Sequence, residues 1–598
     1  MQRIMWAYRS KIILRSIFKH YKEIEKTSCR QNSNIVRSPF TNVEVPNSPL
    51  PDFIFESFGK FPNEIAVECC LTGKNYTFDE IRIKSHNFNT NLRNKLKLKK
   101  SDIVAVILPN LPDFPICVLG AMQAGLIVTN INPRFTAGEI SCQLQNINVK
   151  AIITLSGLYN VAKHATNIAK LDIPVLIVKL QQADSIPNGA IDINEFIQMK
   201  CDIEDVKSIA SEDVAMLPFT SGTTGKSKGV ELTHKNIITH LCQINHEDVR
   251  HTPVTSKIHK NTFLGILPWC HAYGITIGLF YNLYEHSKIV AVPQFTSDVF
   301  VNLLAKYKPN ILHVVPSLLV SMSASVKPEL FDPVQVILSA AAPLSKKDEE
   351  YFLNNVNKKV NILQAYGMTE GLVMLFETIK GKKKFQSTES TLQPLPNTFI
   401  KVVSTENQST EGLGPYEKGE LLVKGPQLMK GYHMCSNQAE GFLSDGWLKT
   451  GDLGYYDKNG FFSICDRIKD VIKVNGFQVV PSELENILRN HDSIVDAVVI
   501  GIPDKKYGEV PLAFVVPELS RKINVADVKQ YVSRNVVHYK QLKGGIIVLD
   551  DFPKNELGKV LRKELKRKYQ SSDLQSQQKY SVPINSGVTK DEAPIVSV

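Results

Sequence analysis

Short apolar segments alternate with helical patterns along most of this chain, and this alternation limits its possible folds more than any other feature. Residues 103–108 (IVAVIL) and 151–155 have the continuous apolar character of buried strands, residues 115–125 have a helical pattern, and residues 126–129 form another apolar run. Strands that alternate with helices pair in parallel and are covered on both faces. We therefore expect an α/β fold, with mostly parallel sheets covered by helices, over residues 45–465.

A second, smaller domain is expected after this region, because 598 residues exceed what a single core normally sustains. Near Asp466 the sequence changes to short β-runs surrounded by Lys and Arg, followed by a helix start in which Ser482 is the expected N-cap. We assign residues 466–570 to a small, mobile α+β domain. Residues 571–598 are polar and contain dispersed Pro and Gly, so we expect them to be disordered.

Residues 1–44 form a basic leader. Residues 1–37 contain nine Lys or Arg and two Glu, so +7 of the net charge of +11 lies there and the rest of the chain is nearly neutral. A basic, acid-poor amphipathic segment is typical of a mitochondrial presequence; the alternatives are a disordered extension or a helix that contacts a membrane surface. The remainder shows no basic stripe with interleaved aromatics, so nucleic acid is not an expected partner.

Cysteine usage and hydropathy suggest an intracellular protein without a membrane span. The ten Cys form no CxxC pair, and no secretory signal pattern is present, so we expect reduced thiols and a mitochondrial, cytosolic or peroxisomal location. The C-terminal residues do not form a Ser-Lys-Leu type peroxisomal address. The longest apolar run, residues 114–128, is too short to cross a bilayer, so no transmembrane segment is expected.

Residues 220–229 (TSGTTGKSKG) form the segment that points most clearly to chemistry. Its Gly, hydroxyl and Lys residues allow backbone N–H groups, O–H groups and an ammonium to surround a phosphate. It is not a Walker A loop, because position 220 is Thr where that motif has Gly, and because a strand-like run at 229–232 precedes the helix that Thr233 is expected to cap. With another buried strand expected at 214–219, the loop joins two strands. A solvated turn is the alternative interpretation.

Three further segments give this loop a context: residues 364–370 (QAYGMTE), 446–467 (GWLKTGDLGYYDKNGFFSICDR) and 553–563 (PKNELGKVLRK). In this order, and with the loop at 220–229, they resemble the adenylate-forming superfamily of acyl-CoA synthetases, coumarate CoA ligases, luciferases and peptide-synthetase adenylation domains. The resemblance covers about residues 50–570. It implies that a carboxylic acid reacts with ATP to give an acyl-AMP and pyrophosphate, and that the acyl group then passes to coenzyme A.

The resemblance also implies a role for individual residues, with ATP, Mg²⁺ and coenzyme A as cofactors. Phosphate contacts come from Thr220, Ser221, Gly222, Thr223, Thr224, Gly225 and Lys228. Glu370 binds Mg²⁺, and Thr369 contacts the α-phosphate. The adenine slot is formed by Gln364, Ala365, Tyr366 and Gly367, while Asp452 and Arg467 contact the ribose. Lys559 bridges the substrate carboxylate to the α-phosphate, Asp466 and Lys469 form the hinge of a pivoting small domain, and Lys473 and Gly476 lie where coenzyme A passes.

By the same resemblance, the acyl pocket is lined by His271, Tyr273, Ile277, Ala340, Ala341, Val373 and Met374. Because Ile277, Val373 and Met374 offer no hydrogen bond to a phenol, we expect a medium- or long-chain fatty acid, with the chain length open. A coumarate-type aromatic acid ligase and a luciferase-like oxygenase are the alternatives within the superfamily. A catalytically inactive nucleotide-binding scaffold is the alternative from another class, although Lys559 and Glu370 are both present.

Overall fold

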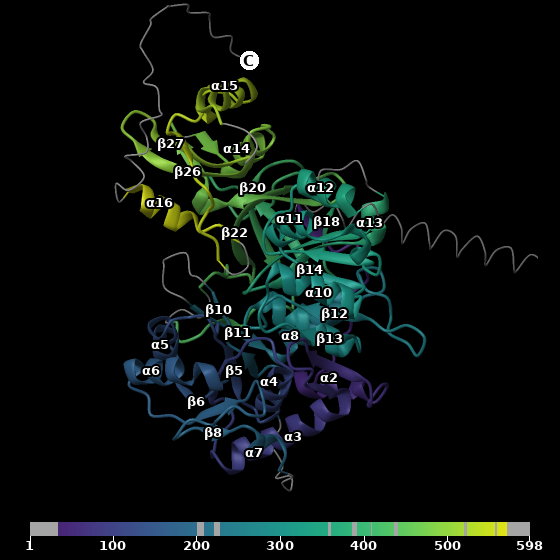
Figure 1. Cartoon of the computed structure of the whole chain (residues 1–598). Helices are drawn as coiled ribbons and strands as arrows, with labels where there is room; N and C mark the ends of the chain where they lie inside the picture. The colour runs from purple at the N-terminus through teal and green to yellow at the C-terminus, as the bar shows by residue number, and fades with distance from the viewer. Residues whose placement is uncertain are drawn as a thin grey trace, which may run out of the picture.

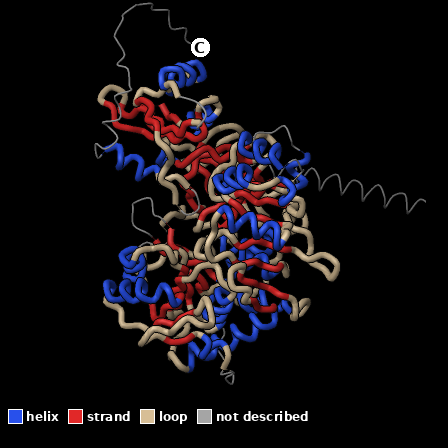
Figure 2. The backbone as a smooth tube through the Cα atoms, viewed as in Figure 1, coloured by secondary structure: helices blue, strands red, loops and turns tan. Residues whose placement is uncertain are grey.

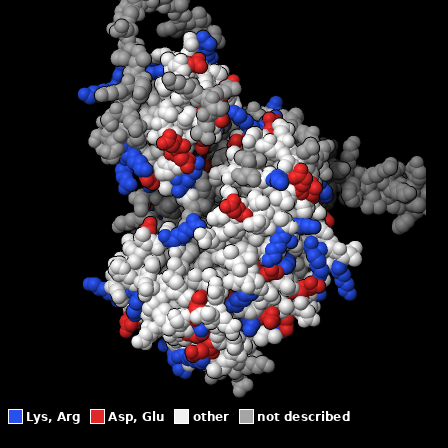
Figure 3. Space-filling model, viewed as in Figure 1, with Lys and Arg blue, Asp and Glu red and all other residues white. Residues whose placement is uncertain are grey.

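The structure is a computed structural model that describes residues 34–199, 209–220, 228–356, 360–384, 391–407, 409–435, 440–475, 477–518, 523–555 and 559–570. Most of the basic leader and the whole C-terminal tail therefore lie outside the described residues. Among the helices that these residues form, none combines the length and the apolar character needed to traverse a bilayer. Figure 3 shows basic and acidic side chains interspersed on the face in view.

The N-terminal part of the chain forms a mixed sheet, with nine strands in the described residues. Its strands are β4 (Ile103–Ile107), β5 (Ile127–Asn130), β6 (Val149–Leu155), β7 (Val175–Val178), β8 (Ile191–Asp192), β9 (Val214–Met216), β10 (Phe219–Thr220), β11 (Lys228–Thr233) and β21 (Gly431–Tyr432). Strands β4 to β9 pair in parallel, whereas β11 pairs antiparallel with β9, β10 and β21. The strand expected at 214–219 is interrupted before Phe219, where Pro218 has no N–H group for a strand pairing.

Helices cover both faces of this sheet, as Figure 2 shows. Successive residues of a strand point to opposite faces, and in β4 Val104 and Val106 pack in the core that contains α4 (Asp113–Gln123) and α3 (Phe78–Asn94). The intervening residues of β4 pack against α5 (Ala137–Gln145) and α6 (Tyr159–Ala169). The expected covering of a sheet by helices on both faces is therefore confirmed here.

The second sheet has 14 strands in the described residues, and it too is mixed. Its strands are β1 (Ile35–Arg37), β2 (Ile65–Cys69), β3 (Asn75–Thr77), β12 (Thr262–Gly265), β13 (Lys288–Ala291), β14 (Ile311–Val314), β15 (Val336–Ser339), β16 (Asn361–Met368), β17 (Leu372–Glu377), β18 (Leu392–Pro394), β19 (Phe399–Val403), β20 (Gly419–Lys424), β22 (Leu448–Tyr456) and β23 (Phe462–Arg467). The run from β2 to β16 through β12–β15 is parallel, and the strands from β17 onward pair antiparallel. The sheets are thus less uniformly parallel than expected, because among the described residues only the short helix at 379–384 separates two of the later strands.

Further helices pack on the parallel half of this sheet. On one face Leu312 and Val314 of β14 share a core with α10 (Ser297–Tyr307), α11 (Pro316–Ser325) and α12 (Lys346–Val356). The other face meets the π-helix η2 (Gly274–Tyr281) and α8 (His234–Ile244), which begins at the expected N-cap Thr233 with Asn236 completing a capping box. The remaining helical segments are α2 (Leu50–Phe58), α7 (Asn194–Ile197), α9 (Asn282–Tyr284), α13 (Ile379–Lys384), η1 (Ser156–Leu158), η3 (Pro328–Phe331), η4 (Ile468–Asp470) and η5 (His538–Lys540).

The C-terminal part is a separate layer of sheet and helices, at the green to yellow end of the chain in Figure 1. Its strands are β24 (Ile472–Val474), β25 (Phe477–Val479), β26 (Ile494–Asp504), β27 (Gly508–Pro517) and β28 (Gly545–Val548). Helices α14 (Pro481–Arg489) and α15 (Val525–Asn535) pack on one face and α16 (Arg562–Gln570) on the other. The α/β class with a small α+β C-terminal domain is confirmed.

One helix start in this domain differs from the expectation. Ser482 is not the N-cap of α14, because Pro481 already occupies the first turn and Val480 is the capping position. The Ser482 hydroxyl donates to the Cys465 carbonyl at 2.7 Å, and its backbone N–H donates to Asp466 Oδ2 at 3.0 Å. A carboxylate from the preceding strand therefore satisfies the helix N-terminus, as the helix dipole favours.

Candidate active site

The predicted phosphate loop lies between two paired strands. Thr220 at the end of β10 is in register with Lys228 at the start of β11, so the chain leaves and re-enters the sheet at one point. Ser221, Gly222, Thr223, Thr224 and Gly225 lie outside the described residues. Lys228 Nζ lies 2.6 Å from Glu440 Oε1 and 4.9 Å from the centre of the Tyr432 ring. The hydrogen bond from Lys228 lowers the pKa of the Glu440 carboxyl, so this ammonium already has an anionic partner at the base of the loop.

Tyr432 links this lysine to the predicted magnesium ligand. Its hydroxyl donates to Glu370 Oε1 at 2.9 Å, and the Glu370 carbonyl accepts from the Met429 N–H at 2.8 Å. Glu370 is 7% exposed and, with half-buried Thr369, forms the turn between β16 and β17. Burial and the neighbouring carboxylate raise the pKa of Tyr432, so its phenol remains a hydrogen-bond donor.

The donor set around Glu370 suits Mg²⁺. Proteins hold this ion with one or two carboxylates and leave its other positions to phosphate oxygens and water. In the part of the chain that the structure describes, no group of three or more His, Cys, Asp or Glu side chains could enclose a metal. One buried carboxylate close to Lys228 therefore fits an ion that arrives with a triphosphate.

Asp452 connects three predicted nucleotide-binding residues. It lies on β22 in register with Arg467 on β23, and the Arg467 Nε lies 2.8 Å from Asp452 Oδ1. The Tyr366 hydroxyl donates to Asp452 Oδ2 at 2.5 Å. Burial raises the pKa of Asp452, while Arg467 and Tyr366 act in the opposite direction. The result is a carboxylate that is oriented by a phenol and a guanidinium.

The other predicted adenine-slot residues lie on β16, the strand that carries Tyr366. The Gln364 N–H donates to Glu377 Oε2 at 2.9 Å, and Gln364 Oε1 accepts from the Leu344 N–H at 3.3 Å. Ala365 is buried. Gly367 is required by its surroundings, because a Cβ there would lie 2.0 Å from the Leu372 carbonyl oxygen. Strand β16 thus brings its backbone close to β17 beside Tyr366.

Lys559, in the C-terminal domain, interacts electrostatically with this group. The charges that affect its ammonium are those of Asp452, Arg467 and Lys469, so the predicted catalytic lysine lies within electrostatic range of the predicted ribose site. The side chain is solvent-accessible, yet the surrounding protein lowers the pKa of its ammonium, and repulsion by Arg467 and Lys469 adds to this effect. Asp452 opposes the shift.

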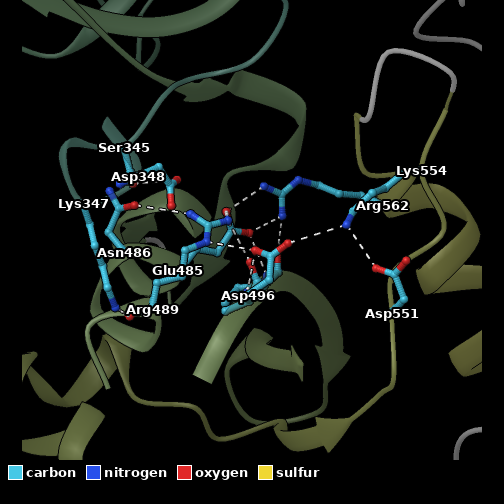
Figure 4. Close-up of polar contacts among 12 residues, drawn as sticks. Ser345, Lys347, Asp348, Glu485, Asn486, Arg489, Asp496, Asp551, Lys554 and Arg562 are labelled. Atoms are coloured by element: carbon cyan, nitrogen blue, oxygen red, sulfur yellow. Dashed lines mark hydrogen bonds and ion pairs between the residues drawn. The ribbon is translucent and has the colours of Figure 1, made fainter. Parts of the chain in front are cut away.

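The chain around Lys559 is anchored on both sides, as Figure 4 shows for Lys554 and Arg562. Lys554 Nζ lies 3.0 Å from Asp551 Oδ1 and 3.9 Å from Asp496 Oδ2. Arg562 binds both carboxylate oxygens of Glu485 and donates to the Val499 carbonyl at 2.8 Å. At the base of the loop, the Asn555 N–H donates to the Lys559 carbonyl at 2.9 Å, and Asn555 Oδ1 accepts from the Lys559 N–H at 2.9 Å.

The predicted hinge lies where β23 leaves the large sheet. Asp466 accepts from the backbone N–H groups of Arg467 and Ser482, and burial raises the pKa of its carboxyl. Burial lowers the pKa of Lys469, which follows in η4. Lys473 is exposed on β24, and Gly476 lies outside the described residues. The hydrogen bond from Lys347 Nζ to the Arg489 carbonyl, at 2.5 Å, crosses from the large domain to the small one.

The predicted acyl-pocket residues come from three neighbouring elements. Ile277 in η2, Ala340 after β15, and Val373 and Met374 in β17 belong to one buried cluster, against which the partly buried Tyr273 packs. The Tyr273 hydroxyl donates to the Leu338 carbonyl at 2.9 Å. His271 is half-buried beside them, whereas Ala341 is exposed and has a left-handed backbone with φ of 72°. The structure thus buries four of these residues in the main core of the large domain, packs Tyr273 against that core, and leaves Ala341 at the surface.

Sequence reasoning missed four residues of this region: Tyr432, Glu440, His251 and His313. Tyr432 and Glu440 hold Lys228, but they follow it by about two hundred positions, and no motif connects them to the loop. His251 and His313 lie side by side next to Tyr273, with their Nε2 atoms 3.4 Å apart. Each is an isolated histidine in its segment, so only the fold reveals the pair.

Comparison with known proteins agrees with this arrangement. The family model described as AMP-binding enzyme matches residues 54–433, and the model of the AMP-binding enzyme C-terminal domain matches residues 483–559. The 4-coumarate–CoA ligase 1 of Arabidopsis thaliana is 33% identical over 558 residues, which cover 91% of this chain and 97% of that protein. A probable 4-coumarate–CoA ligase 1 of Dictyostelium discoideum is 32% identical over 88% of this chain and 97% of its own length.

A solved structure shares the fold. ATP-bound MatB from Rhodopseudomonas palustris superposes with a TM-score of 0.76 at 24% identity, covering 87% of this chain and 99% of that one. At this identity the likeness concerns the fold alone.

Proposed function

Since the chain belongs to the AMP-binding enzyme family, we propose that it is an AMP-forming ligase that joins a carboxylic acid to the thiol of coenzyme A. The acid's carboxylate oxygen attacks the α-phosphorus of ATP, which expels pyrophosphate and leaves an acyl-AMP. The coenzyme A sulfur then attacks the acyl carbonyl carbon, losing its proton, and AMP departs with the former carboxylate oxygen. The electrostatic interaction of Lys559 with Asp452 and Arg467 is the observation that carries this proposal.

The proposed roles follow from the charges at each position. Lys228 and the loop that follows Thr220 would contact the outer phosphates, and Glu370 would hold a Mg²⁺ that offsets part of their negative charge. Asp452 accepts hydrogen bonds from the ribose hydroxyls. Lys559 draws the anionic carboxylate and the anionic α-phosphate together, which is the electrostatic barrier of the first step.

We further propose that the acid is an arylpropenoic acid of the 4-coumarate class. This is the alternative that the sequence analysis placed second to a fatty acid, and it is supported by relatives that are named 4-coumarate–CoA ligases and cover most of the chain. The buried, apolar Ile277, Val373 and Met374 favour a fatty acid, whereas His313, whose ring stacks on that of Tyr273, and its neighbour His251 favour an acid with a polar group.

The test is a coupled assay of AMP release with 4-coumarate, benzoate and fatty acids of graded length, each with and without coenzyme A. We expect AMP formation that depends on both coenzyme A and an arylpropenoic acid. Turnover of fatty acids with none of the aromatic acids accepted would refute the substrate class. An absence of AMP release with every acid would refute the ligase and would favour an inactive nucleotide-binding scaffold. Light emission with luciferin would instead identify a luciferase-like oxygenase.

A further inference from the structure

Two buried histidines face each other beside the predicted acyl pocket. His313 lies on β14, and His251 lies in the segment between α8 and β12. Their exposed fractions are 0% and 1%, and their Nε2 atoms are 3.4 Å apart. Neither belongs to the nucleotide site, so the ligase mechanism leaves this pair without a role.

Contacts of His313 place the pair against the predicted pocket. Its ring stacks on that of Tyr273, with 5.9 Å between centroids and an interplanar angle of 19°. The Tyr273 hydroxyl donates to the carbonyl of Leu338, the residue in register with His313 on the neighbouring strand. The histidine therefore lies directly behind a predicted pocket residue.

Contacts of His251 show at which end of the predicted acyl pocket the histidine pair lies. Its ring lies 5.6 Å from that of Phe376 and 5.4 Å from that of Tyr281. Phe376 follows Met374 by two positions, so both point to the same face of β17, and Phe376 is farther along the strand from Glu370. The pair thus lies beyond Met374, at the end of the pocket away from the phosphates.

The protonation states of the two imidazole rings determine which ring nitrogens donate and which accept hydrogen bonds. Burial lowers the pKa of His251 to about 3 and that of His313 well below its ordinary range, so both rings are neutral at neutral pH and each carries one N–H. In the bond between the two Nε2 atoms, one ring donates and the other accepts. The donating ring therefore has a bare Nδ1 acceptor, and the accepting ring has an Nδ1–H donor. Among the described residues, neither Nδ1 has a hydrogen-bond partner.

A buried donor and a buried acceptor without partners are costly, and they indicate a polar group that is supplied from outside the protein. The rings meet through their Nε2 atoms with 5.5 Å between centroids, so their Nδ1 atoms lie on opposite sides of the pair and one hydroxyl can reach only one of them. A phenolic hydroxyl both donates and accepts, so it matches that Nδ1 in either tautomer. We propose that the Nδ1 of His313, whose ring stacks on that of Tyr273, binds the ring hydroxyl of the aromatic acid while His251 fixes its tautomer, and that the pair thereby selects for hydroxylated substrates. This inference rests on the proposed function, and it makes the two histidines specificity-determining residues of the same reaction.

The proposal is tested with three acids of similar shape: 4-coumarate, 4-methylcinnamate, in which a methyl group replaces the hydroxyl, and cinnamate. We expect the wild-type enzyme to prefer 4-coumarate over 4-methylcinnamate in kcat/KM. In His313→Phe and His251→Phe, this preference should fall by about 3- to 10-fold, the effect of one hydrogen bond. Turnover of cinnamate should stay near the wild-type value, and His313→Asn, which retains a donor and an acceptor, should restore part of the preference.

His286→Phe is the matched control, because His286 is also buried and neutral but binds the Ser57 carbonyl at 2.7 Å in another part of the core. It should alter the unfolding temperature without altering the preference. An unchanged preference for 4-coumarate in both His251→Phe and His313→Phe would refute the proposal. It would indicate that ordered water satisfies the Nδ1 atoms of the two histidines. If the variants do not fold, a wild-type enzyme that accepts 4-methylcinnamate as well as 4-coumarate refutes it equally. A wild-type enzyme inactive with all three acids would instead refute the proposed function.

Discussion

The anchor of the Lys559 loop provides the sharpest quantitative prediction. Arg562→Met keeps most of the side-chain volume but removes two hydrogen bonds to Glu485 and one to the Val499 carbonyl. The Glu485 side chain is 5% exposed and would retain its bond from the Val499 N–H, with Arg489 at 3.9 Å. The substitution thus leaves a carboxylate buried without its main counterion.

Removing one partner of a buried ion pair costs about 3–5 kcal/mol. The Arg562 side chain keeps 24% of its surface accessible, so the lower end, about 3 kcal/mol, applies here. For a domain of about 100 residues, that loss lowers the unfolding temperature by roughly 10–20 °C. Because Arg562 follows Lys559 by three positions, the rate of pyrophosphate release should fall as well.

Differential scanning calorimetry and hydrogen exchange across α16 and β26 measure the first effect, and a pyrophosphate assay measures the second. Lys568→Met is the control, because Lys568 lies on the same helix with 51% of its side chain exposed and pairs with Glu564. It should change stability by less than about 1 kcal/mol. An Arg562→Met protein that unfolds at the wild-type temperature would refute the energetic reasoning. A destabilised variant with full pyrophosphate release would refute the positioning of Lys559 by this anchor.

Three further substitutions test other parts of the site. Lys559→Ala should lower acyl-adenylate formation by about 10²- to 10³-fold while thioester formation from supplied acyl-adenylate survives, and equal loss of both steps would contradict the role of this lysine. Arg467→Gln removes a cation that lowers the pKa of both Asp452 and Lys559, so both values should rise. Since Asp452 acts ionised and Lys559 acts protonated, both limbs of the pH profile of kcat/KM for ATP should move to higher pH; limbs that stay in place would argue against these two groups. Ala341→Gly should raise the unfolding temperature by relieving the φ of 72°, a gain of up to about 1 kcal/mol, and a lower temperature would mean that the Ala341 methyl group makes a favourable contact.

Local patterns predicted the local structure. The apolar run at 103–108 forms β4, and Thr233 caps α8 through its hydroxyl, because both depend on residues only a few positions apart. Where a distant residue intervened, the prediction failed: Ser482 has the composition of an N-cap, but Asp466 takes that function from the end of β23. A single sequence cannot show which strand will lie beside a helix start.

In the site, too, local motifs were informative, whereas contacts between distant segments could not be predicted. The family resemblance assigned Asp452, Arg467 and Lys559 to one nucleotide site, and in the structure the charges of these three residues interact. Tyr432 and Glu440 reach Lys228 through the pairing of β21 with β11, which no local pattern indicates. His251 and His313 meet because the segment between α8 and β12 contacts β14, and this contact makes the surroundings of the predicted acyl pocket partly polar.

Both anchors of the Lys559 loop bind within the C-terminal domain itself: Lys554 to Asp496 and Asp551, and Arg562 to Glu485 and Val499. The residues on both sides of Lys559 are therefore attached to that domain. If the domain rotates about Asp466 as we predict, Lys559 moves with it, and its ammonium leaves the site of Asp452 and Arg467. On this prediction, the orientation of the C-terminal domain determines whether the first reaction can proceed.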